Sequence, residues 1–155
     1  MNVAPPLPLI AWNVSHDSKV FWTRDTTSYV TAAQEMVAYG TFTSGGQPEL
    51  ERTPGFPVLL VPGVWLGQLE LVTIALNIML SAATVWLVYR LSLQLFGRPQ
   101  MAAVAAALYA IEPLSILYCS FLLTETLFAF LTALMLLCME LYIQLNTLRH
   151  LIGSA

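Results

Sequence analysis

The chain has 155 residues, of which 57% are apolar and only 10% are charged, and its mean hydropathy is +0.71. This composition excludes a soluble globular domain and indicates an integral membrane protein. The net charge of −3 includes no run of lysines or arginines, so neither a nucleic-acid-binding surface nor a peripheral contact with anionic lipid is expected.

Residues 1–20 (MNVAPPLPLIAWNVSHDSKV) contain neither a cleavable signal peptide nor an apolar run long enough to cross a membrane. Prolines interrupt the short apolar stretch that is present. The polar segment that follows needs some element to bring it across a membrane. Either a further membrane helix lies upstream of this sequence, which we expect, or the segment crosses by a route that the sequence does not show.

A helix is predicted over about residues 26–39. Asp25 or Thr26 can cap its first turn, and Gly40 is a suitable end. Five side chains share one apolar face at helical spacing, namely Tyr29, Ala32, Ala33, Met36 and Val37. This pattern is typical of an amphipathic helix that lies on a membrane surface or packs against membrane spans.

The segment TSGGQPE after this helix has the composition of a turn-rich loop. The prolines of RTPGFP (residues 52–57) then redirect the chain into a short apolar segment over residues 58–66. We therefore interpret residues 1–67 as an external head and residues 68–150 as a transmembrane region.

Three apolar runs in the transmembrane region are long enough to cross a bilayer. They cover about residues 71–89, 101–118 and 121–142, so that only two residues separate the last two runs, which form a tight hairpin. The predicted fold is an all-α integral membrane protein with about three transmembrane helices and an N-terminal external region that carries the amphipathic surface helix.

The basic residues beside the spans predict their orientation. Arg90 and Arg98 flank the loop between the first two spans, and Arg149 follows the third, so these ends are expected in the cytoplasm. The external head and the tip of the hairpin would then face the periplasm or the exterior.

Carboxylates inside apolar runs are functional candidates because charge is costly there. Glu112 and Glu125 lie toward the outer ends of the second and third spans. Glu112 has two interpretations, since it is either functional or simply bonded to backbone groups that the Pro113 kink sets free.

Two charged residues of the head also have two interpretations each. Asp25 either caps the following helix or belongs to a functional site. Arg52 either binds a phosphate bidentately at the membrane surface or pairs with Glu49 or Glu51. No glycine-rich phosphate loop, nucleophile elbow or metal-spaced Cys/His cluster is present, so hydrolase and ATPase functions gain no support, and neither a metal nor a cofactor is predicted.

Five sequence words follow one another in a familiar order: RDTTSYVTAAQEMVAYGTF, RTPGFP, LN at residues 76–77, YRLSLQLFG and AAVAAALYAIEPLSILYCSFLLTETLFAFL. Together they resemble the N-terminal part of the GT-C membrane glycosyltransferases, especially the dolichyl-phosphate-mannose protein mannosyltransferases and the bacterial lipid A aminoarabinose transferases. The resemblance covers about residues 20–135. Thr53 and Phe56 stand where proline and tyrosine are more usual in that family, and Glu112 occupies a position that is commonly uncharged.

The resemblance implies an enzyme of the membrane, here a bacterial inner membrane, that transfers a sugar from a polyprenyl-phosphate carrier to an acceptor on the outer face. It implies that Asp25 is the catalytic residue, accepting or orienting the proton of the acceptor hydroxyl. It also implies that Arg52, Glu125 and Tyr29 bind the substrate and its lipid phosphate, with Glu125 either completing the cluster or holding Arg52. The expected partners are the donor lipid, the bilayer and an acceptor.

Enzymes of this family build their carrier cavity from many spans, so we expect three spans to be the N-terminal portion of an enzyme and to be inactive alone. The alternative is a small non-catalytic membrane protein, or a degraded paralogue, that packs against a partner subunit through the small-residue stripe of Ala102, Ala106 and Ala110. Transport through Glu112 and Glu125 is a weaker interpretation because no inverted repeat is visible.

Overall fold

The computed structural model describes residues 22–23 and 25–153, with side chains described as far as residue 146. The expectations for residues 1–20 and for the side chain of Arg149 lie outside this part of the chain. The described residues form two compact units. The first contains the head up to Leu76 together with Ser120–Thr124, and the second contains Asn77–Cys119 and the residues from Glu125 onward.

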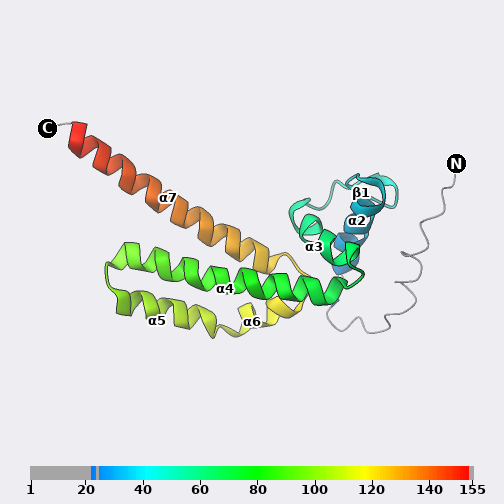
Figure 1. Ribbon diagram of the computed structural model, residues 1–155, viewed down its shortest axis with the longest axis horizontal. Coiled ribbons are helices and arrows are strands. Elements are labelled where there is room, and N and C mark those ends of the chain that lie inside the picture. Colours follow the sequence, from blue (N-terminus) through cyan, green and yellow to red (C-terminus); the bar gives the residue numbers. More distant parts are fainter. Residues whose placement is uncertain (1–21, 24, 154–155) are drawn as a thin grey trace. The chain divides into compact units, whose positions relative to one another are not determined.

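Helices dominate both units (Figure 1), and the predicted all-α membrane fold is confirmed. In chain order the described helices are α2 (Thr26–Tyr39), α3 (Gly55–Trp65), α4 (Leu69–Phe96), α5 (Pro99–Ala110), α6 (Pro113–Ser120) and α7 (Glu125–Gly153). By length and composition, α4 and the part of α7 up to Asn146 can each cross a membrane, and the bent pair of α5 and α6 brings the number of spans to as many as three.

In the first unit, α2 covers the residues expected for it and packs against α3. Gly40 ends the helix in the left-handed conformation, with φ of 69°, and its N–H bonds to the Met36 carbonyl. The buried side of α2 is narrower than its predicted apolar face, because Val37 is 38% exposed. The buried side chains that fill this unit include Tyr29, Val30, Ala32 and Ala33 from α2, and Phe56 and Leu60 from α3.

A small antiparallel hairpin follows α2, in the segment that the sequence predicts as a loop. Strands β1 (Thr43–Ser44) and β2 (Gln47–Pro48) are joined by Gly45 and Gly46, whose φ angles of 66° and 78° suit a two-residue turn. The Glu35 carboxylate on α2 accepts hydrogen bonds from both glycine N–H groups, at 2.7 and 3.3 Å, and from the Thr43 hydroxyl. Glu35 therefore fastens the hairpin to α2.

The connection between α6 and α7 is longer than the sequence suggests. It covers residues 121–124, so α7 begins at Glu125 instead of near residue 121. Leu122 in this connection is fully buried in the first unit, and its carbonyl accepts a hydrogen bond from Thr26. This anchoring explains why the helix does not extend further toward its N-terminus.

In the second unit, the run expected as one span over residues 101–118 is broken into α5 and α6, which are bent by 51°. Pro113 cannot donate a backbone hydrogen bond and disfavours a helical conformation for Glu112 before it. The Glu112 carboxylate accepts from the N–H groups of Leu114 (3.1 Å) and Ser115 (2.5 Å), which are free because α6 begins there. Of the two interpretations of Glu112, the structural one is observed.

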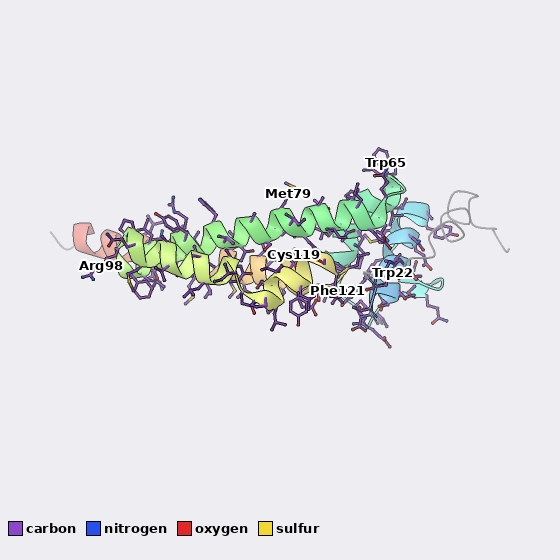
Figure 2. The ribbon with its side chains drawn as sticks, turned by 90° about the horizontal axis from the view of Figure 1, so that it is seen from below. Trp22, Trp65, Met79, Arg98, Cys119 and Phe121 are labelled. Carbon is purple, nitrogen blue, oxygen red and sulfur yellow. The ribbon has the colours of Figure 1, made fainter. Side chains whose placement is uncertain are left out.

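Large apolar side chains on the long helices of the second unit point outward, as lipid contact requires. Met79 and Phe128 are 68% and 71% exposed, and Met79 projects away from α4 in Figure 2. A smaller set packs inward around Leu87, Ala133 and Leu137. Exposure of this extent suits a hydrocarbon solvent and would be costly in water.

The small-residue stripe of α5 is largely used within the chain. Ala102 is fully buried and Ala106 is 8% exposed, whereas Ala110 is exposed. Small side chains allow close approach of neighbouring helices, and two of these three alanines already serve that purpose inside the second unit.

Gly63 of α3 lies close to the backbone at the start of α4. A Cβ atom there would lie 3.0 Å from both the Cα and the carbonyl oxygen of Leu69, at the start of α4. We expect Gly63→Ala to destabilise the protein by roughly 1–3 kcal/mol, because backbone atoms must move to admit the methyl group. Thermal unfolding in detergent would measure this loss. Val58→Ala on the same helix, where the side chain is 51% exposed, is the control, and equal midpoints for the two variants would contradict the expectation.

Candidate active site

The start of α2 is held by a network of threonine hydroxyls. The Thr26 hydroxyl accepts a hydrogen bond from the Thr23 N–H at 2.9 Å, lies 3.0 Å from the Thr23 hydroxyl, and donates to the Leu122 carbonyl at 3.2 Å. In return, the Thr26 N–H donates to the Thr23 carbonyl. Because Thr26 is fully buried, these bonds fix the position of the residue next to it, Asp25.

Asp25 occupies the N-cap position of α2, but its side chain makes no capping hydrogen bond. Its backbone is helical (φ −80°, ψ −24°), whereas a capping side chain usually requires an extended conformation. The Ser28 hydroxyl donates to the Asp25 carbonyl at 2.8 Å. Of the two interpretations of Asp25, capping is therefore not the one observed, and the carboxylate is available for another partner.

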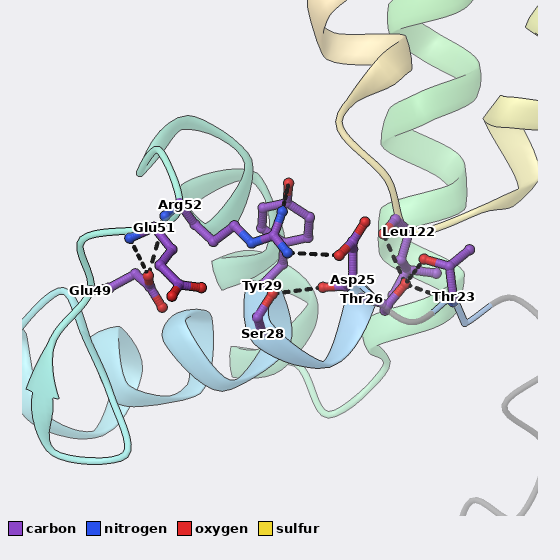
Figure 3. Close-up of polar contacts among 9 residues, drawn as sticks. All are labelled: Thr23, Asp25, Thr26, Ser28, Tyr29, Glu49, Glu51, Arg52 and Leu122. Carbon is purple, nitrogen blue, oxygen red and sulfur yellow. Dashed lines mark hydrogen bonds and ion pairs between the residues drawn. The ribbon is translucent and has the colours of Figure 1, made fainter.

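That partner is Arg52, from the turn that precedes α3. The Arg52 Nη2 atom lies 2.7 Å from Asp25 Oδ1 and forms a charged hydrogen bond across 27 positions of sequence (Figure 3). The Arg52 side chain is 29% exposed and that of Asp25 is 56% exposed, so both remain accessible to a ligand. The pair is a surface ion pair, and its contribution to stability alone is small.

Tyr29, one helical turn after Asp25, supports the same guanidinium. The Arg52 Cζ atom lies 5.1 Å from the centre of the Tyr29 ring, within the range of a cation–π contact, and Nη1 lies 3.4 Å from the tyrosine hydroxyl. The Tyr29 ring in turn meets Phe56 edge to face, with centroids 5.2 Å apart. Tyr29 is 8% exposed and Phe56 is 1% exposed, so the surface on which Arg52 rests is rigidly packed.

Glu49 fixes the backbone on the other side of Arg52. Its carboxylate Oε1 accepts hydrogen bonds from the backbone N–H groups of Glu51 (2.8 Å) and Arg52 (3.2 Å) (Figure 3). The alternative in which the guanidinium pairs with Glu49 or Glu51 is thus not observed, because the ion pair runs to Asp25.

The hydrogen bond from Arg52 to Asp25 raises the pKa of the guanidinium above its ordinary value, although partial burial opposes the change. Arg52, like arginines in general, is positively charged at neutral pH. A guanidinium carries five N–H donors, and two of its nitrogens contact Asp25 and Tyr29. The exposed part of Arg52 can therefore still bind an anion while Asp25 and Tyr29 hold it in place.

Glu125, the remaining residue of the predicted set, is the first residue of α7 and belongs to the second unit. Its predicted place beside Arg52 stays a prediction. Within its own unit Glu125 lines a small cavity together with Thr126 and Ala129.

No group of three or more histidine, cysteine, aspartate or glutamate side chains able to hold a metal ion occurs among the described residues. The guanidinium of Arg52 contacts one carboxylate, that of Asp25, and one phenol, that of Tyr29. Sequence reasoning had missed the supporting residues Thr26 and Glu49. The threonine could be identified only as a possible cap, because its partner Leu122 is 96 positions away.

The chain matches one known protein family over most of its length. Residues 52–155, about two thirds of the chain, match the family described as dolichyl-phosphate-mannose-protein mannosyltransferase. No curated protein and no solved structure matches the chain significantly. The matched range begins at Arg52 and includes Glu125, whereas Asp25 and Tyr29 lie upstream of it.

The buried Thr26 hydroxyl provides a test of how the site is held. We expect Thr26→Val to destabilise the first unit by about 1–3 kcal/mol, because the Leu122 carbonyl and the Thr23 N–H lose a buried partner. Denaturant unfolding in detergent would measure the loss. Thr31→Val on the same helix removes an exposed hydroxyl bonded only to the Thr27 carbonyl and should be nearly neutral. An equally small effect of both substitutions would show that the network does not hold α2.

Proposed function

Because the chain belongs to the dolichyl-phosphate-mannose-protein mannosyltransferase family, we propose that it is a membrane glycosyltransferase, or the N-terminal portion of one. It transfers a sugar from a polyprenyl-phosphate carrier to a hydroxyl of an acceptor. The observation that carries this proposal is the contact of Asp25 with Arg52, which places a proton acceptor 2.7 Å from a fixed positive charge.

In the proposed reaction the acceptor oxygen attacks the anomeric carbon of the donor and inverts it. The new bond forms between that oxygen and the anomeric carbon while the bond from the anomeric carbon to the phosphate oxygen breaks, and its electron pair stays on the phosphate. Asp25 accepts the proton that the acceptor hydroxyl loses. Two observations support this role: the Asp25 side chain is exposed, and it makes no capping hydrogen bond to α2.

Arg52 stabilises the polyprenyl phosphate that leaves. Negative charge accumulates on the phosphate as the sugar departs, and a guanidinium already held in position stabilises that charge without reorganisation. The phosphate binds the exposed N–H donors of Arg52, while the hydrogen bond to Asp25 keeps the guanidinium in position.

Tyr29 positions Arg52 in this mechanism. It was predicted to bind the substrate, but its side chain is only 8% exposed and its ring and hydroxyl both contact the guanidinium. We assign it to holding Arg52 instead of contacting the donor directly.

The reaction takes place on the outer face of the membrane, in a bacterial inner membrane. Arg90 and Arg98 lie near the C-terminal end of α4, and basic residues beside a span favour the cytoplasm. The Arg90 guanidinium lies 5.6 Å from the centre of the Trp86 ring, an arrangement that suits a membrane interface. The N-terminal end of α4, which follows the head, then meets the opposite surface.

The alternative of a non-catalytic subunit that binds a partner through the alanine stripe is less well supported. Ala102 and Ala106 are buried within the chain, so that of the three residues only Ala110 is exposed.

The role of Asp25 is tested by Asp25→Asn, which keeps the shape of the side chain and removes its basicity. We expect the rate of sugar transfer to fall by about 10²–10⁴-fold, with little change in donor binding. Transfer of a radiolabelled sugar from its polyprenyl-phosphate carrier would be followed in membranes from cells that make the complete enzyme of which this chain is the N-terminal portion. Glu51→Gln, an acidic neighbour of Arg52 outside the ion pair, is the control. Unchanged transfer by the Asp25 variant would remove it from the catalytic role.

The role of Arg52 is tested by comparing two substitutions. We expect Arg52→Ala to lower the transfer rate by about 10²–10³-fold, and Arg52→Lys to retain part of it, because lysine keeps the charge but not the bidentate geometry. Donor binding would be measured in parallel with the same labelled lipid. Arg98→Ala removes an arginine from the α4–α5 connection and should leave both quantities unchanged. Equal activities of Arg52→Ala and the unaltered chain would contradict the assignment.

A further inference from the structure

Helix α3 is apolar on all sides, although it belongs to the head. Its sequence GFPVLLVPGVW contains no charged side chain, and the Trp65 indole is its only side-chain hydrogen-bond donor. The side that packs inward includes Phe56, Leu60 and Gly63, which are all buried. The opposite side is called here the outer face of α3. A helix that is apolar all round is usually buried, either in a protein core or in a membrane.

The outer face of α3 consists of Val58, Val61, Pro62 and Trp65. These positions follow the spacing i, i+3, i+4 and i+7, which places their side chains on one side of a helix. Val58 is 51% exposed and Trp65 is 76% exposed, and the Trp65 ring projects away from the ribbon in Figure 2. Leu66, directly after the helix, is 59% exposed. The outer face is therefore open and entirely apolar.

Helix α2, which packs against α3, has a polar side outward instead. Thr27 is exposed, and Ser28, Thr31 and Gln34 are partly exposed. Their hydroxyl and amide groups can form hydrogen bonds with water, whereas the outer face of α3 offers water almost nothing to bond. Two helices that share one core thus differ on their outer sides, which indicates that those sides meet different surroundings.

The outer face of α3 adjoins a candidate membrane span. A Cβ atom on Gly63 would lie 3.0 Å from backbone atoms of Leu69, the first residue of α4, so α3 lies against the start of that helix. Leu71, in the first turn of α4, is 68% exposed. Because α4 is long and apolar enough to cross a membrane, the exposed apolar side chains of its first turn face lipid. The outer face of α3 continues this surface.

We propose that the outer face of α3 inserts into the interface of the lipid bilayer. Eleven helical residues reach only about 17 Å, so α3 is too short to cross roughly 30 Å of hydrocarbon. Pro62 has no N–H to donate to the Val58 carbonyl, and that carbonyl finds water at the interface but not deeper in the bilayer. Tryptophan is also enriched at this level of the membrane.

The absence of lysine and arginine from α3 restricts the kind of lipid that the proposal requires. Insertion then depends on apolar area and not on attraction to anionic headgroups, so a zwitterionic bilayer suffices. The proposal concerns the first unit alone and does not depend on the proposed function.

A nitroxide label on Val58→Cys tests the proposal, and Gln34→Cys on the outer side of α2 is the matched control. Both are made in the full chain with Cys119→Ser and Cys138→Ala, and are reconstituted in phosphatidylcholine vesicles. Molecular oxygen concentrates in hydrocarbon, whereas a water-soluble nickel chelate stays outside it. We expect oxygen to relax the label at position 58 several-fold more than the chelate does, and the reverse at position 34.

The same measurement distinguishes lipid from other surroundings. If the chelate relaxes the labels at positions 58 and 34 equally, the outer face lies in water. If neither reagent reaches position 58, a protein surface such as a second copy of the chain covers it. Either result would overturn the proposal.

Trp65 provides a second measurement that needs no label. The difference in fluorescence between the unaltered chain and Trp65→Phe gives the emission of Trp65, and Trp86→Phe gives that of a tryptophan on α4 that is 56% exposed. We expect lipids with brominated acyl chains to quench both tryptophans, and aqueous iodide to quench Trp65 only weakly. Strong quenching of Trp65 by iodide and none by the brominated lipid would contradict insertion. This readout decides the question if Val58→Cys fails to fold.

Discussion

Two side chains hold the guanidinium of Arg52 and a third fixes its backbone, and the site that we propose depends on that confinement. Asp25 bonds to one nitrogen, the Tyr29 ring and hydroxyl lie against the group, and Glu49 fixes the backbone from which it extends. Asp25 and Tyr29 contact one side chain because they are four positions apart, one turn of α2. Without these contacts the long Arg52 side chain would sample many rotamers. Each contact restricts it before a ligand binds, so less side-chain conformational entropy is lost on binding.

Local signals in the sequence account for much of the fold. Gly40 correctly predicted the end of α2, and the apolar runs correctly indicated a membrane protein. The hairpin after α2 was missed, although two adjacent glycines at its turn are a recognised signal, because its strands contain only two residues each and show no alternation. The anchoring of Thr26 to Leu122 could not be predicted, since it joins residues 96 positions apart and neither residue is unusual in its own segment.

In the second span, the sequence shows where the helix can bend, but hydropathy does not show that it does bend. Pro113 marks the kink, but residues on both sides of it are equally apolar, so hydropathy alone gives one continuous run. The bend has two consequences for polar groups. It frees backbone N–H groups that Glu112 then satisfies, and α6, which begins at the bend, contributes Ser115 and Tyr118 to the cavity that contains Glu125. Glu112 and Glu125 look equivalent in the sequence but differ in their contacts. The Glu112 carboxylate accepts hydrogen bonds from backbone N–H groups, whereas Glu125 Oε2 is buried without a hydrogen-bond partner.

The family match begins at Arg52, whereas Asp25 lies upstream of the matched range. Sequence similarity alone would therefore connect Arg52 with the family and would give no reason to consider Asp25. The 2.7 Å contact between them changes this conclusion, because a charge pair constrains both partners. Replacing Asp25 would leave the guanidinium with a different neighbour and a different orientation, and replacing Arg52 would leave the carboxylate unpaired at the start of a helix. The site that we propose therefore extends upstream of the matched range, and its smallest chemical unit is the ion pair together with Tyr29.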